Sequence, residues 1–475
     1  MRKRVFTVLV VLIIILSFAI MSNASPNNGR ASGKNAVFFI HPDGTDQSHY
    51  TLMRLIHYGA DGESNWDKLP NVAIYKSHMA DSVTGTSHGG ATTHATGIKW
   101  PWNTFGAPGK TIVHEAMDAG YAVALIQSGH IAEPGTAAFV AYSPGGRGEA
   151  AEIAKKVIES GVPIIMAGGE RWLIPNTKRA FHPDRKGNNY EPMGSRTDGL
   201  DLIEYARSQG YTVVYTREQL MNINPRRVNK LLGVFAYDHT FFDISERRLH
   251  AINLVDPNGR PILYEPNAPT VKEMLEVSIK ILKRIGKRGF FVVLEEEGTD
   301  NFPNGGMNAE GTIEAAKRAD DAIGLAFDYA KRNPNTFILT AADSTAGAVQ
   351  IYDPYVYQPS MIEVVNEVEY LRDLVIDPCS AVRTDRREPL VDGITDFSLW
   401  HPNTNNTHFR ERPFISRDNY KFFVMWNACG GPDFGGGTIV RAYGSGRMGP
   451  IAEDVKGTID NTMIYHYLKR ALHIE

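Results

Sequence analysis

Short apolar segments recur along this chain and alternate with amphipathic stretches. The apolar segments cover residues 36–40, 121–127, 163–167, 212–215, 231–236, 290–294, 336–340, 422–426 and 439–442. Between them, residues 148–161 and 308–333 place apolar side chains three and four positions apart, which predicts helices. Continuous apolar strands that alternate with helices are typical of a mostly parallel sheet. We therefore expect an α/β fold, a three-layer sandwich with helices on both faces of the sheet.

The chain shows no internal repeat or low-complexity linker that would divide it into separate units. We therefore expect residues 25–475 to form a single domain, although the length alone allows two or three. One stretch, residues 352–420, is rich in Pro, Asn, Arg and aromatic residues. It is interpreted as a loop-rich insert over one edge of the sheet.

Residues 1–24 have the pattern of a secretory signal peptide. Three basic residues, Arg2 to Arg4, precede an apolar run from Val5 to Met21, and small residues up to Ala24 follow it. The pattern predicts a secreted or periplasmic protein, with an uncleaved N-terminal anchor as the alternative. The net charge of -3 favours neither a nucleic-acid partner nor an anionic membrane surface. A small-molecule partner is expected, and a homodimer is the default oligomer.

The chain contains only two cysteines, Cys379 and Cys429. A disulfide between them is an open alternative in an oxidising compartment. Two thiols cannot form the framework of a disulfide-built fold, so stability has to come from a large apolar core.

Acidic residues follow three of the expected strands. Asp43 comes after the first strand, Glu295 to Glu297 and Asp300 come after residues 290–294, and Asp343 comes after residues 336–340. The carboxyl ends of parallel strands meet at one edge of a sheet, where ligands bind. Carboxylates gathered there repel one another unless a cation lies between them. A turn or capping role explains one such residue, but three on successive buried strands favour a metal site.

The stretch "TSHGGATTHATGIK", residues 86–99, places Ser87 before two glycines. An exposed loop is one interpretation. The other is the start of a helix whose free backbone N–H groups face an anion, with Ser87 at its tip as a nucleophile. A helix-capping role for Ser87 is compatible with the second interpretation.

These motifs resemble, in order, those of the alkaline phosphatase family. "NAVFFIHPDGT" is similar to the family's first strand, whose final Asp bridges metal ions, and this maps to Asp43. "TSHGGATTHATGIK" resembles the nucleophile segment, with Ser87 at the serine. "HIAEPGTAAFVAYSPGGRGEAAEIA" resembles the segment with the phosphate-binding arginine, here Arg147. "GGGTIVRAYG" and "DNTMIYHYL" look like the family's end, and "GFFVVLEEEGTD" and "NTFILTAADS" resemble the two metal-ligand strands, which gives Glu295, Asp300 and Asp343.

The resemblance implies the alkaline phosphatase fold and a secreted, metal-dependent phosphomonoesterase. Ser87 would attack phosphorus in line and form a phosphoserine, which metal-bound hydroxide then hydrolyses, while Arg147 holds two non-bridging oxygens. A phosphodiesterase of the same superfamily is the nearest alternative. A sulfatase is less favoured because no Cys/Ser-x-Pro-x-Arg string surrounds Ser87. A phosphate- or metal-binding protein without turnover is the alternative from another class.

Several positions depart from the family pattern. Other residues stand where the resemblance would place the family's zinc-binding histidines: Asn304, Ser344, and Asp433 or Phe434. Gly135 stands for a metal-binding Thr, Thr86 for the Asp before the nucleophile, and Glu133 for an Asp near the third metal. The ligand set that remains offers only oxygen and consists of Asp43, Ser87, Glu295, Asp300, Asn304, Asp343 and Ser344. Oxygen ligands favour Mg²⁺, Ca²⁺ or Mn²⁺, whereas the resemblance alone implies Zn²⁺.

Five histidines are candidates for a nitrogen ligand that would restore zinc binding: His88, His94, His239, His401 and His408. Loop histidines more often serve as surface or capping groups. His88 is distinctive because it neighbours the expected nucleophile, where it could act as a base or a phosphate donor. Of Glu296 and Glu297, only one can share a face with Glu295, because side chains alternate along a strand.

Overall fold

The computed structural model describes residues 33–186, 191–372, 390–397, 410–426, 433–435 and 438–474. Its centre is a ten-stranded sheet, which is mostly parallel; β17 alone among the described strands of this sheet runs antiparallel to its neighbours. The strands follow one another across the sheet in the order β18 (Gly457–Asp460), β2 (Asn71–Lys76), β17 (Ile439–Gly444), β8 (Thr336–Thr340), β1 (Asn35–Pro42), β7 (Gly289–Glu296), β3 (Tyr121–His130), β4 (Ile164–Gly168), β6 (Leu231–Val234) and β5 (Thr212–Val214). The expected α/β fold with a mostly parallel sheet is confirmed.

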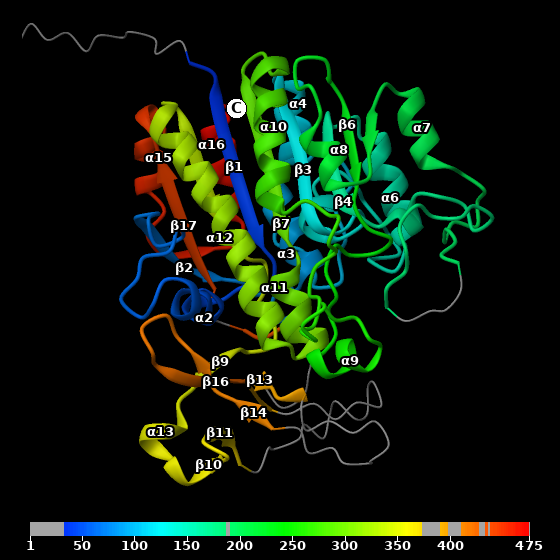
Figure 1. Ribbon diagram of the computed structural model, residues 1–475. Helices are drawn as coiled ribbons and strands as arrows, with labels where there is room; N and C mark the ends of the chain where they lie inside the picture. Colours follow the sequence, from blue (N-terminus) through cyan, green and yellow to red (C-terminus); the bar gives the residue numbers. More distant parts are fainter. Residues whose placement is uncertain are drawn as a thin grey trace, which may run out of the picture. The chain divides into compact units, whose positions relative to one another are not determined.

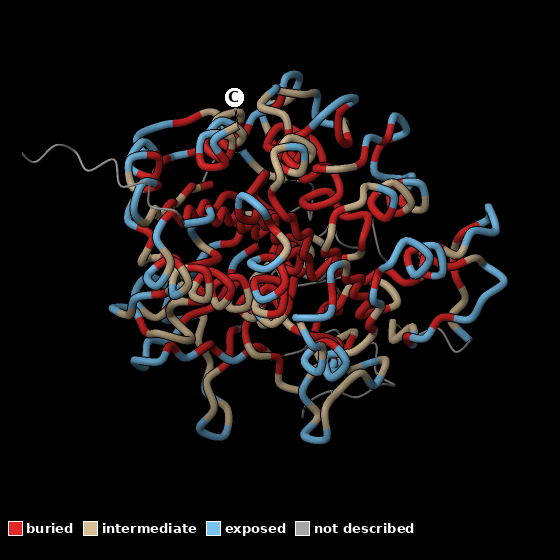
Figure 2. The backbone as a smooth tube through the Cα atoms, turned by 90° about the horizontal axis from the view of Figure 1, so that it is seen from above, coloured by how far each residue is buried: buried red, intermediate tan, exposed pale blue. Residues whose placement is uncertain are grey.

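Helices pack on both faces of this sheet, and Figure 1 shows α10 and α12 crossing one face. That face carries α2 (Gln47–His57), α8 (Arg217–Met221), α10 (Val271–Ile285) and α12 (Ala309–Arg332). The other face carries α3 (Ser87–Thr96), α4 (Ile112–Asp118), α5 (Pro134–Ala137), α6 (Ala150–Glu159), α7 (Leu202–Ser208), α15 (Gly449–Glu453) and α16 (Met463–Ala471). In Figure 2 the buried backbone gathers in the middle and the exposed segments lie around it.

The two faces of β1 show how the chain builds two cores. Val37 and Phe39 belong to the core under α3, whereas Phe38 and Ile40 belong to the core under α10 and α12. Alternation along a strand sends successive side chains to opposite faces. A strand buried on both faces must therefore be apolar throughout, and this is why its sequence reads as a continuous apolar run.

The two amphipathic stretches form helices as expected, and their ends carry recognisable signals. Helix α12 begins after Asn308, whose side chain accepts from the Gly311 N–H at 2.6 Å, and its last turn holds Lys331 and Arg332. Helix α6 buries Ile153 and Val157 against the sheet. The cap satisfies a free N–H group, and the basic residues complement the negative end of the helix dipole.

Several strands differ from expectation. Residues 422–426 overlap β16 (Lys421–Met425), which lies outside the main sheet and pairs with β9 (Gln350–Tyr352), β12 (Val391–Asp392) and β15 (Phe414–Ile415). Strands β2 and β18 were not predicted. Strand β2 contains a short apolar run, Val72 to Tyr75, that was missed, and its buried and exposed side chains alternate. Strand β18 is short, mostly exposed and without an apolar run.

The segment from Tyr352 to Tyr420 contains short antiparallel pairs where it is described. Strand β10 (Ile362–Val365) pairs with β11 (Val368–Leu371), and β13 (Ile394–Thr395) pairs with β14 (Glu411–Arg412). The signal segment 1–24, Cys379, Cys429, His401 and His408 lie outside the described residues. None of the described helices is long and apolar enough to span a membrane.

Candidate metal and phosphate site

The expected acidic residues converge because three strands are neighbours. Strand β1 lies between β7 and β8 and pairs in parallel with both, so their carboxyl ends meet at one edge. Asp43 directly follows β1, Glu295 lies near the end of β7, and Asp343 follows β8. The Asp43 N–H donates to the Glu296 carbonyl at 3.1 Å, which extends the ladder to the cluster. All three carboxylates are fully buried.

One group of ligand atoms comes from Asp43, Glu295 and Glu297, which lie within 4.8 Å of one another. Both oxygens of Asp43 and of Glu295, and Oε2 of Glu297, have no hydrogen-bond partner among the described residues. Burial raises the pKa of each carboxyl well above its ordinary value, and the negative charges of the neighbouring carboxylates raise it further. Buried carboxylates without partners fit a divalent cation, and oxygen donors suit Mg²⁺, Ca²⁺ or Mn²⁺.

Of Glu296 and Glu297, it is Glu297 whose side chain lies on the same side of the sheet as that of Glu295. Glu296 points to the other face, where its carboxylate pairs with Arg318 on α12, with Nη2 to Oε1 at 3.0 Å. The ambiguity in the sequence is therefore resolved by strand alternation, which puts residues two apart on one face.

A second group of possible ligand atoms comes from His41, Asp43 and Asp343. His41 Nε2 lies 3.2 Å from Asp343 Oδ2, and both side chains are fully buried. No sequence motif singled out His41. The signal that could have found it is the spacing of two from Asp43, which puts both side chains on one face of β1.

Asp300 and Asp433 extend the cluster. Burial, then the charges of Asp43 and Asp433, raises the pKa of Asp300 well above its ordinary value. Burial and the charge of Asp43 raise the pKa of Asp433 to about 7. Of the two alternatives for the third histidine position, Asp433 is thus the one that belongs to the acidic cluster. The Phe434 N–H donates to the Thr345 carbonyl at 2.8 Å and so anchors the segment.

Two further expected ligands have different surroundings. Ser344 is buried beside Asp343 and donates to its Oδ1 at 3.3 Å. Asn304 is half-buried in the helical turn η2 (Phe302–Gly306), just after α11 (Gly298–Asn301). Ser344 is therefore in contact with the cluster, and metal binding by Asn304 stays a prediction.

Ser87 is the first residue of α3, as the helix interpretation of residues 86–99 predicts. The helix cap is Thr86, whose hydroxyl accepts from the Gly89 N–H at 3.2 Å, so Ser87 itself does not cap the helix. Ser87 is buried and lies beside Asp43, close enough for its hydroxyl to act to lower the pKa of that carboxyl. The nucleophile candidate therefore contacts the residue at the centre of the carboxylate cluster.

The glycines after Ser87 bring α3 close to the end of β8. A β-carbon on Gly90 would lie 2.5 Å from the Asp343 β-carbon, which no real side chain tolerates. The glycine thus lets the helix N-terminus approach the carboxylates, where its N–H groups can face an anion.

Two histidines of the same helix differ in their surroundings. Burial, followed by the positive charge of Arg147, lowers the pKa of His88 to about 4, so His88 is neutral at physiological pH. A neutral imidazole can still donate one hydrogen bond to phosphate, but it is a weak base. His94 is buried deeper, and its Nε2 is shared with the Tyr75 hydroxyl. His94 therefore has a structural partner away from the cluster.

Arg147 lies next to the acidic cluster and pairs with Glu133, with Nη2 to Oε2 at 2.6 Å. Its side chain is 46% exposed, so a ligand from solvent can reach it. The charge of Glu133, and after it those of Glu297, Asp300 and Asp43, raises the pKa of Arg147 further. The guanidinium of Arg147, placed beside this carboxylate cluster, can bind the non-bridging oxygens of a phosphoryl group.

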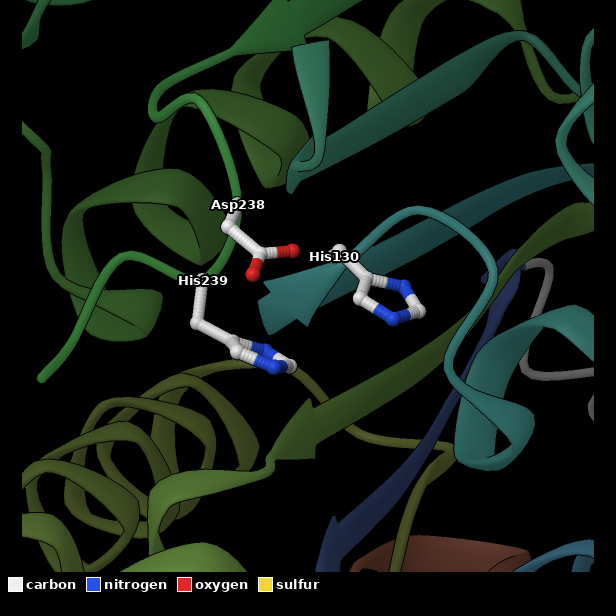
Figure 3. Close-up of side chains that lie close together, drawn as sticks. All are labelled: His130, Asp238 and His239. Carbon is white, nitrogen blue, oxygen red and sulfur yellow. The ribbon is translucent and has the colours of Figure 1, made fainter. Parts of the chain in front are cut away.

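Behind Glu133 lie His130, Asp238 and His239, shown in Figure 3. His130 Nε2 is 2.9 Å from Glu133 Oε1, and its Nδ1 accepts from the Ala132 N–H at 3.2 Å. The His130 and His239 rings stack with centroids 4.9 Å apart. Both nitrogens of His130 are thus engaged within the protein, and His130 helps to hold Glu133 in place.

The fold and the site together define an α/β protein with a serine at a helix N-terminus and buried carboxylates suited to divalent metals. The family model for alkaline phosphatase matches residues 33–474, and the chain belongs to this family of metal-dependent phosphoesterases.

The relatives are distant in sequence. The alkaline phosphatase of Gadus morhua is 24% identical over 394 residues, which cover 74% of this chain and 76% of that protein. The tissue-nonspecific isozyme of Rattus norvegicus is 25% identical over 364 residues, covering 68% of this chain and 65% of that protein. Among solved structures, the Thermus thermophilus alkaline phosphatase has a TM-score of 0.65 at 20% identity and covers 93% of this chain and 92% of its own. The enzyme from the Antarctic bacterium TAB5 has a TM-score of 0.62 at 17% identity, with 93% and 99% covered.

Proposed function

We propose that this protein hydrolyses phosphate monoesters of small molecules through a phosphoserine formed at Ser87. The observation that supports this most strongly is the contact between Ser87 and Asp43 at the centre of the carboxylate cluster. A serine that only capped a helix would bond to backbone N–H groups, and Thr86 already has that role.

The chain's own residues suggest how the reaction proceeds. The Ser87 oxygen attacks phosphorus, and the alcohol of the substrate leaves on the opposite side. Arg147 binds two non-bridging oxygens, and the N-terminal N–H groups of α3 add donors to the phosphoryl group. Divalent metals held by the carboxylates would supply the positive charge that makes the serine hydroxyl and a water molecule acidic enough to react at neutral pH.

We propose that Asp43, Glu295 and Glu297 hold a hard cation, because these ligands are all oxygen. Asp300, Asp433, Asn304, Asp343 and Ser344 are proposed to complete the centre around Asp43. Mg²⁺, Ca²⁺ or Mn²⁺ is therefore expected to restore activity to stripped protein better than Zn²⁺ alone.

The N-terminal pattern of residues 1–24 supports secretion or export to the periplasm as part of this proposal. Detection of mature protein that begins after Ala24 in the medium or periplasm would test it. An intact N-terminus found in the membrane fraction would favour an anchor instead.

The test of activity uses p-nitrophenyl phosphate with protein treated with chelator and then given one metal at a time. Hydrolysis that chelation abolishes and a metal restores supports the proposal. Bis-p-nitrophenyl phosphate is the comparison substrate, because faster hydrolysis of the diester would favour a phosphodiesterase. Stoichiometric metal or phosphate binding without hydrolysis of either ester would favour a binding protein.

A further inference from the structure

His41 lies at the end of β1 and belongs to the group of possible metal ligands that contains Asp43 and Asp343. His41 is the next-to-last residue of β1, and Asp43 directly follows the strand. The side chain of His41 points to the face covered by α3, where its ring contacts that of His94. His41 Nε2 lies 3.2 Å from Asp343 Oδ2. One ligand atom each from His41, Asp43 and Asp343 can be chosen so that all three lie within 4.8 Å of one another.

Neither ring nitrogen of His41 has a hydrogen bond of acceptable geometry to any described residue, although the residue is fully buried. The contact with Asp343 is short in distance but poorly aligned as a hydrogen bond. Burying a polar group without a partner costs free energy, so a buried imidazole of this kind needs a ligand to explain it.

A simple ion pair between protonated His41 and Asp343 is the competing explanation. An ion pair would use Nε2 alone, and it would leave Nδ1 buried without a partner. The neutral form has a free lone pair on one nitrogen, and this is the form that binds metal ions.

We propose that His41 is a nitrogen ligand to a divalent cation held together with Asp43 and Asp343. The centre then contains two kinds of site that share Asp43: an oxygen-only site with Glu295 and Glu297, and a mixed site of one imidazole and two carboxylates. A mixed nitrogen and oxygen site suits borderline cations such as Zn²⁺, Co²⁺ and Mn²⁺. This inference rests on the metal centre of the proposed function, but it concerns binding and can be tested without any substrate.

The comparison is between His41→Gln and His94→Gln. His94 is a matched control because it is equally buried, its ring centroid lies 5.6 Å from that of His41, and its Nε2 is shared with Tyr75. Full-length protein is stripped of metal and then loaded with Mn²⁺. Pulsed electron paramagnetic resonance measures the coupling of the bound Mn²⁺ to ¹⁴N, and a competing chelator measures the affinity for Zn²⁺.

We expect ¹⁴N coupling in the wild-type protein and in His94→Gln, and a lost or clearly reduced coupling in His41→Gln. The affinity for Zn²⁺ should fall in His41→Gln by more than the roughly 10- to 100-fold typical of residues that only support a ligand. His41→Asn provides a second variant, and the thermal unfolding of each metal-free protein checks that the fold is retained.

Absence of ¹⁴N coupling in the wild-type protein would overturn the inference, and so would an unchanged coupling in both His41 variants, because another imidazole would then be the ligand. These outcomes are separate from those for the proposed function. Protein that binds metal through His41 but hydrolyses no phosphoester contradicts only the enzymatic proposal. Metal-dependent hydrolysis without a nitrogen ligand contradicts only the assignment of His41.

Discussion

A β-carbon on Gly135 would lie only 1.9 Å from Oε1 of Glu295. The glycine stands where the family resemblance places a metal-binding threonine, and the carboxylate of Glu295 occupies the space that a side chain would need. The absence of a side chain at position 135 is therefore what leaves room for the carboxylate of Glu295. This relationship can be tested directly.

Gly135→Ala should displace the Glu295 carboxylate from Asp43 and Glu297 and weaken metal binding by roughly 10- to 100-fold. The measurement is metal affinity against a competing chelator. Gly148→Ala is the matched control, because a β-carbon on Gly148 meets nothing within 4 Å. Equal affinities in the two variants would show that the Glu295 carboxylate can relocate without loss of the metal.

Glu296→Gln and Glu297→Gln should have opposite consequences, although the residues are adjacent. Glu296→Gln leaves the guanidinium of Arg318 without its buried carboxylate, which should cost roughly 3 kcal/mol of folding free energy. Glu297→Gln removes one charge from a repelling cluster, so the metal-free protein should keep its stability while metal binding weakens. Chemical unfolding without metal and metal titration separate the two effects. A loss of stability in Glu297→Gln as large as in Glu296→Gln would contradict this division.

The stability of metal-free protein should fall as the pH rises from about 5 to about 8. The pKa of Asp343 is raised to about 6, with burial as the main cause, and that of Asp433 is raised to about 7. Between these pH values the folded protein holds protons that the unfolded chain has released. The stability that these two groups contribute is therefore fully present below about pH 4 and is lost as the pH rises through 6 and 7. Thermal unfolding with chelator present measures the fall.

The same scan in the presence of metal is the control. A cation neutralises the carboxylates, so the fall between about pH 5 and about pH 8 should shrink when metal is bound. An equal fall with and without metal would place the responsible groups outside the cluster.

Arg147→Ala should weaken the binding of phosphate, because the guanidinium is half-exposed beside the cluster and can hold two oxygens. Inhibition by inorganic phosphate measures this, and the inhibition constant should rise by at least about tenfold. Arg147→Lys keeps the charge but loses the paired geometry, so it should recover only part of the binding. Unchanged inhibition in Arg147→Ala would remove this residue from the phosphate site.

Much of the fold could be predicted because a strand buried on both faces leaves a continuous apolar run. Strands β1, β7 and β8 are of this kind, and so the meeting of Asp43, Glu295 and Asp343 could be predicted with them. Strand β2 could have been predicted from its short apolar run, Val72 to Tyr75, although the side chains of Val72 and Ile74 are exposed.

The spacing from Asp43 points to His41, but its proximity to Asp343 could not be predicted because it depends on which strands become neighbours. A histidine at the end of an apolar run resembles a core residue until β8 places Asp343 beside it. The pairing of Glu133 with Arg147, which lies in a loop, likewise depends on the fold, whereas its contact with His130 spans only three residues. Contacts between segments far apart in sequence are set by topology, and the pattern within one segment does not contain them.

The most direct test of the central claim is to quench the reaction with a phosphate monoester in acid and locate the phosphate by mass spectrometry of the digested protein. We expect phosphate on Ser87 in the wild-type protein and in Ser82→Ala, and none in Ser87→Ala, whose turnover should be lower by about 10³-fold or more. Phosphate on another residue, or full turnover in Ser87→Ala, would contradict the account.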